Sequence, residues 1–142
     1  MPAGDSSSRA ACSESPLSLS SEPLLVAAYS GSRTLFSNAT TASVAAKDYG
    51  SHDFVSSADY AAVTLDDYFS DVSHLDLLKI DTDGFDYDVL LGARRTLQEL
   101  RPRVFFEFAP FLLEQAGRKP ADVGAYLSEL GYSEWTVFAP TG

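Results

Sequence analysis

The most strongly patterned part of this chain is an apolar run that ends in acidic residues. Apolar side chains predominate from Leu75 to Ile80, which is the pattern of a strand buried on both faces of a parallel sheet. Asp81, Asp83 and Gly84 follow, and apolar positions then recur with helical spacing. Open α/β sheets bind ligands at the carboxyl ends of their strands. The acids after this strand are therefore the first candidates for a functional site.

The other apolar patterns predict that strands and helices alternate along the chain. Strands are expected at residues 24–29, 34–37, 60–64, 75–80, 103–108 and 135–138. Helices are expected at residues 65–69, 83–100, 111–116 and 120–130, the first of them capped by Thr64. From Leu75 onward the order is strand, helix, strand, helix, strand, which calls for parallel pairing with right-handed crossovers. The predicted fold class is α/β.

Two segments lack a pattern that would build a core. Residues 1–22 are dominated by Ser, Ala and Pro. Their apolar surface is too small to offset the entropy of ordering, so we expect a disordered leader. Residues 38–59 alternate small and polar side chains without a stable period and predict a long loop. The rest of the 142-residue chain, from residue 23 to 142, is expected to form one domain.

The composition narrows the range of functions. The net charge of −10 argues against binding to nucleic acid and against adhesion to anionic membranes. No apolar run approaches the roughly 18 residues that cross a bilayer. Cys12 is the only cysteine, so an internal disulfide and a thiolate metal cluster are both excluded, and we expect a cytoplasmic location. His52 and His74 have no second ligand at metal spacing, so no metal site is expected.

The acids after the central strand allow more than one interpretation. Asp81, Asp83 and Gly84 match the nucleophile loop of haloacid-dehalogenase-like phosphotransferases, but no Gly-Asp acidic loop for magnesium follows them. An EF-hand calcium loop counted from Asp81 fails, because Asp86 and Gly92 stand where its glycine and its bidentate acid are needed. For Asp83 and Asp86 we favour a structural role as helix-capping acids at the positive end of the helix dipole. Asp81 closes the strand and would project into the crevice above the sheet.

Lys79 and Glu107 are further candidates beside Asp81. Lys79 precedes Asp81 by two residues, so both side chains should lie on the same side of the strand. An ion pair between them is the alternative to a role in ligand binding. Glu107 ends the next strand, and two carboxylates at adjacent strand ends can orient a hydroxyl or amine, or one can act as a base. The alternative for Glu107 is a buried acid that accepts hydrogen bonds from backbone N–H groups.

Several segments together resemble the FkbM-type methyltransferases. In order, they are V-T-L-D-D-Y-F at residues 63–69, L-L-K-I-D-T-D-G-F-D at 77–86, V-L-L-G-A at 89–93 and R-P-R-V-F-F-E at 101–107. The similarity in order and spacing covers about residues 24–139. Its most specific part is the Lys-Ile-Asp-x-acid-Gly segment, where the family more often has Glu in place of Asp83.

The resemblance implies a fold, a cofactor and a reaction. The fold would be a Rossmann-like methyltransferase sheet flanked by helices, and the cofactor would be S-adenosylmethionine. Family members are largely sugar and natural-product O-methyltransferases, so a small hydroxylated molecule is the expected methyl acceptor. Asp81 and Glu107 are then the predicted catalytic residues, with Asp81 orienting the substrate or the cofactor's amino group, and Asp81 and Lys79 are the predicted cofactor-binding residues.

The chain departs from the family pattern on its N-terminal side. The family's glycine-containing cofactor loop has no counterpart, since neither Gly4 nor Gly31 follows a strand and opens a helix. By that pattern residues 24–29 correspond to the third strand, so the chain resembles the C-terminal half of the domain without its first two strands. We therefore expect the N-terminal third to pack loosely or re-pair. We also expect the chain to bind S-adenosylmethionine weakly or not at all.

A function of a different class is also compatible with this sequence. The chain would then be a non-catalytic α/β module that docks on a partner or self-associates through a sheet edge left unpaired by the missing strands.

Overall fold

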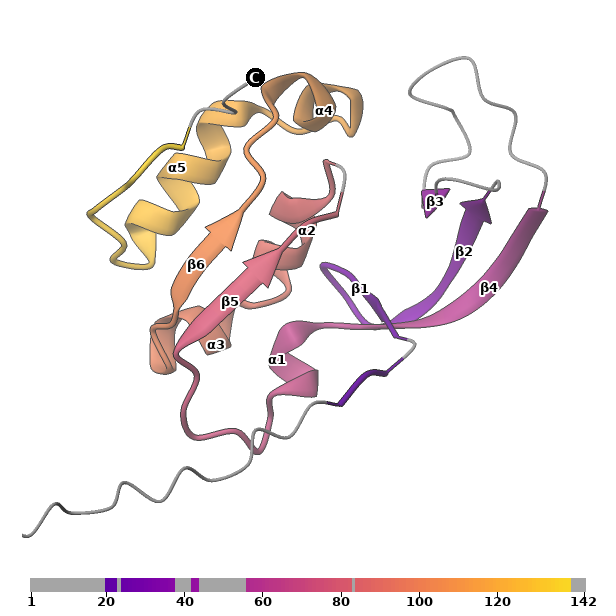
Figure 1. The fold of residues 1–142 in the computed structure, drawn as a ribbon, viewed down its shortest axis with the longest axis horizontal. Coiled ribbons are helices and arrows are strands. Elements are labelled where there is room, and N and C mark those ends of the chain that lie inside the picture. The colour runs from indigo at the N-terminus through magenta and orange to yellow at the C-terminus, as the bar shows by residue number, and fades with distance from the viewer. Residues whose placement is uncertain (1–19, 23, 38–41, 44–55, 83, 139–142) are drawn as a thin grey trace, which may run out of the picture.

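The computed structural model describes residues 20–22, 24–37, 42–43, 56–82 and 84–138. These residues form two small sheets and five helices (Figure 1). The strands are β1 (Leu25–Val26), β2 (Gly31–Ser37), β3 (Ala42–Ser43), β4 (Ser56–Val63), β5 (Leu77–Ile80) and β6 (Arg103–Phe106). The helices are α1 (Leu65–Tyr68), α2 (Asp86–Leu91), α3 (Arg94–Glu99), α4 (Pro110–Gln115) and α5 (Pro120–Glu129).

The central strand and its neighbour pair as the sequence predicts. β5 and β6 are parallel, with Leu77 opposite Arg103 and Ile80 opposite Phe106, so the α/β class and this parallel pairing are confirmed. The predicted strand at residues 135–138 is wrong, because that segment joins neither sheet. A single Rossmann-like sheet stays a prediction, since the described strands are divided between two sheets.

The first sheet is built from the N-terminal part of the chain. Its strand order is β1-β4-β2-β3, with β1 parallel to β4 and β2 antiparallel to it. β1 thus pairs with β4, which agrees with the expectation that this part of the chain re-pairs. The predicted loop at residues 38–59 is wrong where β3 forms and where β4 begins at Ser56. Residues 38–41, 44–55 and most of the predicted leader, residues 1–19, lie outside the described part of the chain.

The long helix predicted at residues 83–100 is instead two helices, α2 and α3, separated at Gly92 and Ala93. The backbone just after β1 passes so close to Gly92 that a Cβ there would lie 2.2 Å from the carbonyl oxygen of Ala27. The carbonyl of Gly92 also accepts a hydrogen bond from the backbone N–H of Asp66, at 2.9 Å. These two contacts join the first sheet and α1 to the helices that cover the second sheet.

The hydrophobic core lies between the β5–β6 sheet and its helices. The apolar stripe predicted on residues 83–100 is buried at Val89, Leu90, Ala93 and Leu97. The stripe predicted on α5 is buried at Val123, Tyr126, Leu127 and Leu130. Leu78 and Ile80 contribute from one face of β5. None of the described helices is long and apolar enough to cross a membrane.

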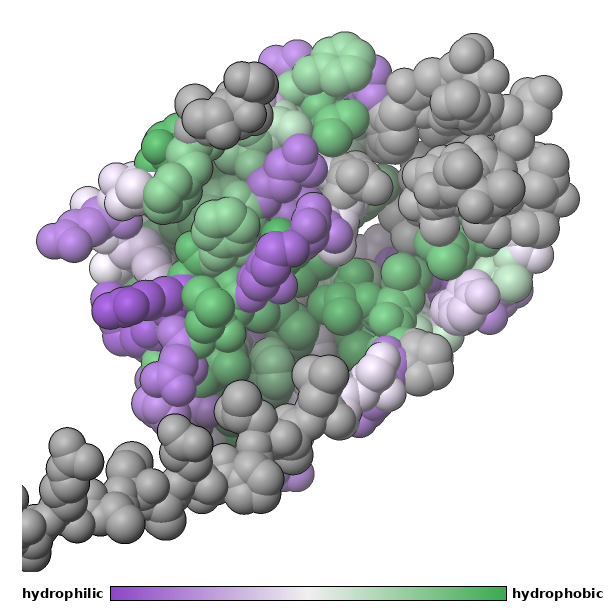
Figure 2. Space-filling model, in the orientation of Figure 1, coloured by the Kyte–Doolittle hydropathy of each residue, from purple (hydrophilic) through white to green (hydrophobic). Residues whose placement is uncertain are grey.

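The opposite face of the β5–β6 sheet is exposed. The burial of β5 alternates, and Leu77 is 57% exposed while Leu78 is buried. Phe105 on β6 is 49% exposed. The expectation that the central strand is buried on both faces is therefore wrong within the described residues. Figure 2 shows this face, where apolar surface is interrupted by polar side chains. Association through an unpaired edge of this sheet stays a prediction.

Two acids at the start of α1 connect the two halves of the molecule. The sequence places Asp66 and Asp67 in the first turn of a helix, and both lie there, with Thr64 as the predicted cap. The carboxylate of Asp66 also accepts from the backbone N–H groups of Arg95 and Thr96, at 2.9 and 2.7 Å. It thereby caps α3, which has no side-chain cap of its own. Asp67 accepts a short hydrogen bond from the hydroxyl of Ser30 in the β1–β2 turn.

The contact at Gly92 predicts a cost for any side chain at this position. Gly92→Ala should lower the free energy of unfolding by about 1–3 kcal/mol, because the Cβ must displace backbone atoms. Gly124→Ala in α5 is the matched control, since a Cβ there meets no atom within 4 Å. It should leave stability unchanged or raise it by up to about 1 kcal/mol. Equal effects of the two substitutions in urea unfolding would contradict the close approach of the Ala27 backbone to Gly92.

The bond between Ser30 and Asp67 predicts a pH-dependent contribution to stability. The hydrogen bond from Ser30, followed by that from Thr64, lowers the pKa of Asp67 below its ordinary value of 3.8. Such a group stabilises the fold above the unfolded-state pKa, and this contribution is lost as the pH falls through the lower folded-state pKa. Ser30→Ala should therefore destabilise the chain at neutral pH. Its deficit relative to the wild type should shrink below about pH 4 in urea unfolding; a deficit that grows with acidity would contradict this assignment.

Candidate functional site

A cleft of about 540 Å³ opens at the carboxyl end of β5. Asp81 and Thr82 line it from the end of the strand, and Phe85 and Asp88 line it from the start of α2. The opposite wall comes from β1, β2 and the turn between them, and the residues after α4 complete the cleft. The other lining residues are Leu25, Val26, Ala27, Ala28, Tyr29, Arg33, Leu35, Ala116 and Arg118. The crevice expected from the sequence is therefore present beside Asp81.

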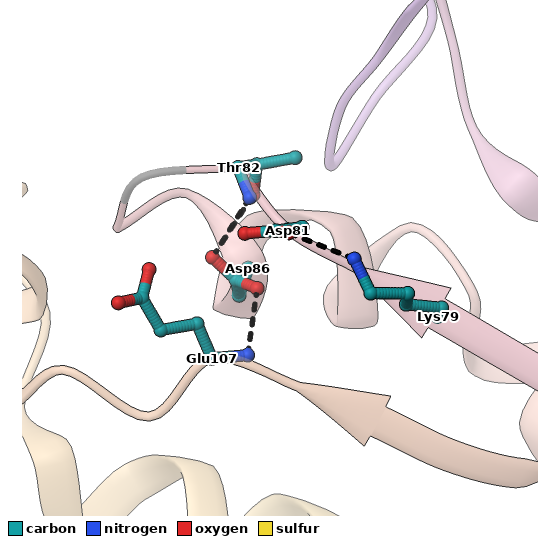
Figure 3. Close-up of polar contacts among 5 residues, drawn as sticks. All are labelled: Lys79, Asp81, Thr82, Asp86 and Glu107. Atoms are coloured by element: carbon teal, nitrogen blue, oxygen red, sulfur yellow. Dashed lines mark hydrogen bonds and ion pairs between the residues drawn. The ribbon is translucent and has the colours of Figure 1, made fainter. Parts of the chain in front are cut away.

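Asp81 and Lys79 form the ion pair that the sequence offers as an alternative to ligand binding. The ammonium of Lys79 donates to the carboxylate of Asp81 at 2.8 Å (Figure 3). Both side chains are largely exposed, at 58% and 62%, and an exposed pair of this kind contributes little to stability. The pair therefore leaves the Asp81 carboxylate accessible to a ligand in the cleft. Whether either residue binds a cofactor or takes part in catalysis stays a prediction.

Glu107 lies at the end of β6, next to the end of β5, as the sequence predicts. Its side chain is exposed, so it is not the buried acid of the alternative interpretation. In Figure 3 the Glu107 carboxylate points away from Asp81, on the other side of Asp86. Asp81 lines the described cleft and Glu107 does not. The two predicted catalytic acids thus come from neighbouring strand ends but do not face the same space.

Asp86 connects the ends of the two strands. Its side chain is buried, with 1% of its surface exposed. One carboxylate oxygen accepts from the hydroxyl and the backbone N–H of Thr82, at 3.0 and 3.4 Å. The other accepts from the backbone N–H of Glu107, at 3.3 Å (Figure 3). Asp86 therefore fixes the backbone immediately after Asp81 and at Glu107.

The sequence predicts a helix-capping role for Asp86, which is less than the role that the structure gives it. It lies in the first turn of α2, as expected, but its carboxylate bonds to two strand ends and the N-cap residue Phe85 makes no side-chain cap bond. Asp83, its predicted capping partner, lies outside the described residues. The one signal available in the sequence is that Val89 and Leu90 of the apolar stripe follow Asp86 by three and four residues. That spacing places Asp86 on the same side of the helix as the stripe.

An ion pair between α2 and the α4–α5 connection forms another part of the cleft wall. The guanidinium of Arg118 donates twice to the carboxylate of Asp88, once at 3.2 Å and once over a shorter distance. The hydrogen bond from Arg118 to Asp88 raises the pKa of Arg118, so this side chain stays charged. The same guanidinium lies 5.8 Å from the ring centre of Tyr87, and burial raises the pKa of the Tyr87 hydroxyl. This wall is held by paired charges.

The position of Asp86 predicts a large effect of a small substitution. Asp86→Asn should lower the free energy of unfolding by about 2–3 kcal/mol, because an amide NH2 would face a backbone donor and the charged acceptor is lost. Asp71→Asn is the matched control, since it makes the same chemical change at an exposed residue. Urea unfolding measures both variants. A loss below about 0.5 kcal/mol for Asp86→Asn would show that this carboxylate does not hold the strand ends.

The comparisons with known proteins give one match. Residues 8–134 match the family model described as the methyltransferase FkbM domain. The match starts within the predicted leader, so the boundary predicted at residue 23 stays a prediction. Searches of curated proteins and of solved structures find no match. Because the family match covers most of the chain, and because the segments that resemble the family carry β5, α2 and β6, this chain belongs to the FkbM methyltransferase domain family.

Proposed function

We propose that this chain takes part in methyl transfer from S-adenosylmethionine to a hydroxyl oxygen of a small molecule. Membership of the FkbM family supports methyl transfer in general. The observation that supports a site for this reaction is the cleft at the carboxyl end of β5, with Asp81 on its wall. Ligands of α/β sheets bind at this end of the strands. The proposed acceptor is a small hydroxylated molecule.

The lining of the cleft fits part of such a cofactor. A volume of about 540 Å³ lies within the range of small-molecule sites. The wall combines apolar residues, including Leu25, Leu35 and Phe85, with the charged residues Asp81 and Arg33. The apolar residues suit a nucleoside, and a carboxylate suits an amino group or a hydroxyl. When bound, S-adenosylmethionine supplies an electrophilic methyl group.

The proposed roles of the chain's residues follow from their positions. Asp81 accepts a hydrogen bond from the acceptor hydroxyl or from the cofactor's amino group and so orients the bound molecule. Lys79 orients the Asp81 carboxylate through their ion pair. Glu107 stays the second candidate acid, although it does not line this cleft, and Asp86 holds its backbone N–H. Methyl transfer depends mainly on placing the oxygen in line with the methyl group, so a strong base is not required.

The affinity for the cofactor is expected to be low. In the sequence before the central strand, neither Gly4 nor Gly31 belongs to a glycine loop that follows a strand and opens a helix, and such a loop would supply backbone donors to the cofactor. We therefore expect a dissociation constant for S-adenosylhomocysteine above about 100 μM. Nuclear magnetic resonance titration of the labelled chain can measure affinities in that range.

The proposal predicts where the cofactor product binds. S-adenosylhomocysteine should shift the amide resonances of Asp81, Thr82 and Phe85. Asp81→Asn should weaken this binding about tenfold, or lower the rate of methyl transfer to a hydroxylated acceptor by a similar factor, because the charged acceptor is lost. Its free energy of unfolding should change by less than about 0.5 kcal/mol, since the side chain is exposed.

Asp71→Asn serves again as the control for a lost surface charge, and it should leave binding and turnover unchanged. The absence of any resonance shift at millimolar S-adenosylhomocysteine would contradict the proposed function. Binding and turnover that are both insensitive to Asp81→Asn would remove Asp81 from the site. A micromolar dissociation constant would contradict the expected low affinity while supporting the function.

A further inference from the structure

We infer that Arg33 binds an anionic group, a carboxylate or a phosphate, on the small molecule that occupies the cleft. This inference rests on the proposed function, because it concerns the same cleft. It starts from the charges on the cleft wall. Within the part of the chain that the structure describes, four charged residues line the cleft, namely Arg33, Asp81, Asp88 and Arg118.

Both acids of the cleft wall already have a cationic partner. Asp88 is paired with Arg118, and Asp81 is paired with Lys79. Arg33 has no carboxylate within ion-pair distance among the described residues. The cleft therefore carries one positive charge that the described residues do not neutralise, although the chain as a whole carries a net charge of −10. An anionic group on a ligand would supply the missing partner.

Among the described residues, the contact that Arg33 makes leaves its hydrogen-bond donors available. Its guanidinium carbon lies 4.0 Å from the ring centre of Tyr29, which also lines the cleft. A contact with a ring face involves the charge of the guanidinium and consumes none of its N–H donors. The contact also restrains a long side chain, so less rotamer freedom is lost when a ligand binds. A guanidinium with free donors matches the two oxygens of a carboxylate or phosphate.

The position of Arg33 makes the anionic group part of a larger recognition pattern. Arg33 belongs to β2, whereas Asp81 follows β5, so the two residues approach the cleft from different sheets. A ligand that contacts both would present an anionic group to Arg33 and a hydrogen-bond donor to Asp81. An amino acid has this combination, and so does an acidic molecule that carries a hydroxyl. The anionic group thus belongs either to the cofactor's amino-acid part or to the methyl acceptor.

The test uses the full chain, labelled with nitrogen-15, and three probes. S-adenosylhomocysteine carries the amino-acid carboxylate, 5′-methylthioadenosine has the same nucleoside without the amino acid, and inorganic phosphate is a simple anion. The readouts are the side-chain Nε resonance of Arg33 and the dissociation constants. Arg33→Gln removes the charge and Arg33→Lys keeps the charge but loses the planar fork. Arg103→Gln is the matched control, because it removes one positive charge from an exposed residue outside the cleft.

If Arg33 binds the cofactor's carboxylate, Arg33→Gln should weaken binding of S-adenosylhomocysteine about tenfold, while binding of 5′-methylthioadenosine changes by less than about twofold. If it binds an acidic acceptor, S-adenosylhomocysteine binding is unchanged. Phosphate then shifts the Arg33 Nε resonance in the wild type and in Arg103→Gln, and the dissociation constant for phosphate, measured from backbone amide resonances, rises in Arg33→Lys and rises further in Arg33→Gln. Either result supports the inference.

The inference is overturned if no probe shifts the Arg33 resonance in the wild type, which requires no variant to fold. It is also overturned if Arg33→Gln and Arg103→Gln respond alike to all three probes. Failure of the proposed function gives a different result. In that case neither adenosine compound binds the wild-type chain, while phosphate still shifts the Arg33 resonance.

Discussion

The hydrogen bonds of the buried Asp86 carboxylate are the constraint on which the candidate site depends. A carboxylate removed from water is costly unless its oxygens receive hydrogen bonds, and here three donors from two strand ends supply them. The same bonds that satisfy the acid fix the turn after Asp81 and the backbone at Glu107. The cleft can therefore keep its shape although Asp81 itself is exposed and, among the described residues, its side chain is held by a surface ion pair alone. Folding and site geometry are coupled at this one residue.

The sequence predicts the local elements of the second half well because each has its own signals. Apolar spacing identifies the buried stripes of α2, α3 and α5, and Thr64 identifies the start of α1. Prediction from the sequence fails where contacts with a distant part of the chain determine the local structure. The break between α2 and α3 lies at Gly92, where the backbone of Ala27 approaches, and an apolar pattern contains no record of that contact. The exposure of Leu77 and Phe105 also cannot be predicted from the sequence, because an apolar run does not show which face of the strand other elements cover.

The sequence likewise predicts some features of the candidate site and not others. The position of Asp81 after a buried strand could be read from the sequence, and so could its ion pair with Lys79, because residues two apart share a side of a strand. The role of Asp86 could not, since its partners come from two strand ends that become neighbours only in the fold. The sequence also does not predict the cleft wall that carries Tyr29 and Arg33. Nothing in residues 24–37 indicates that their turn would face the end of β5.

The close approach of the Ala27 backbone to Gly92 has a consequence for how this sequence can change over evolutionary time. Gly92 has an ordinary φ of −75°, so it is the neighbouring backbone, and not its own conformation, that excludes a side chain. A smaller residue at position 27 would not relieve this obstruction, because the obstructing atoms belong to the peptide group that every residue has. Substitution at this position therefore requires a shift of the backbone at Ala27 and Ala28, which also line the cleft. A point change at position 92 thus alters the cleft wall together with the stability of the fold.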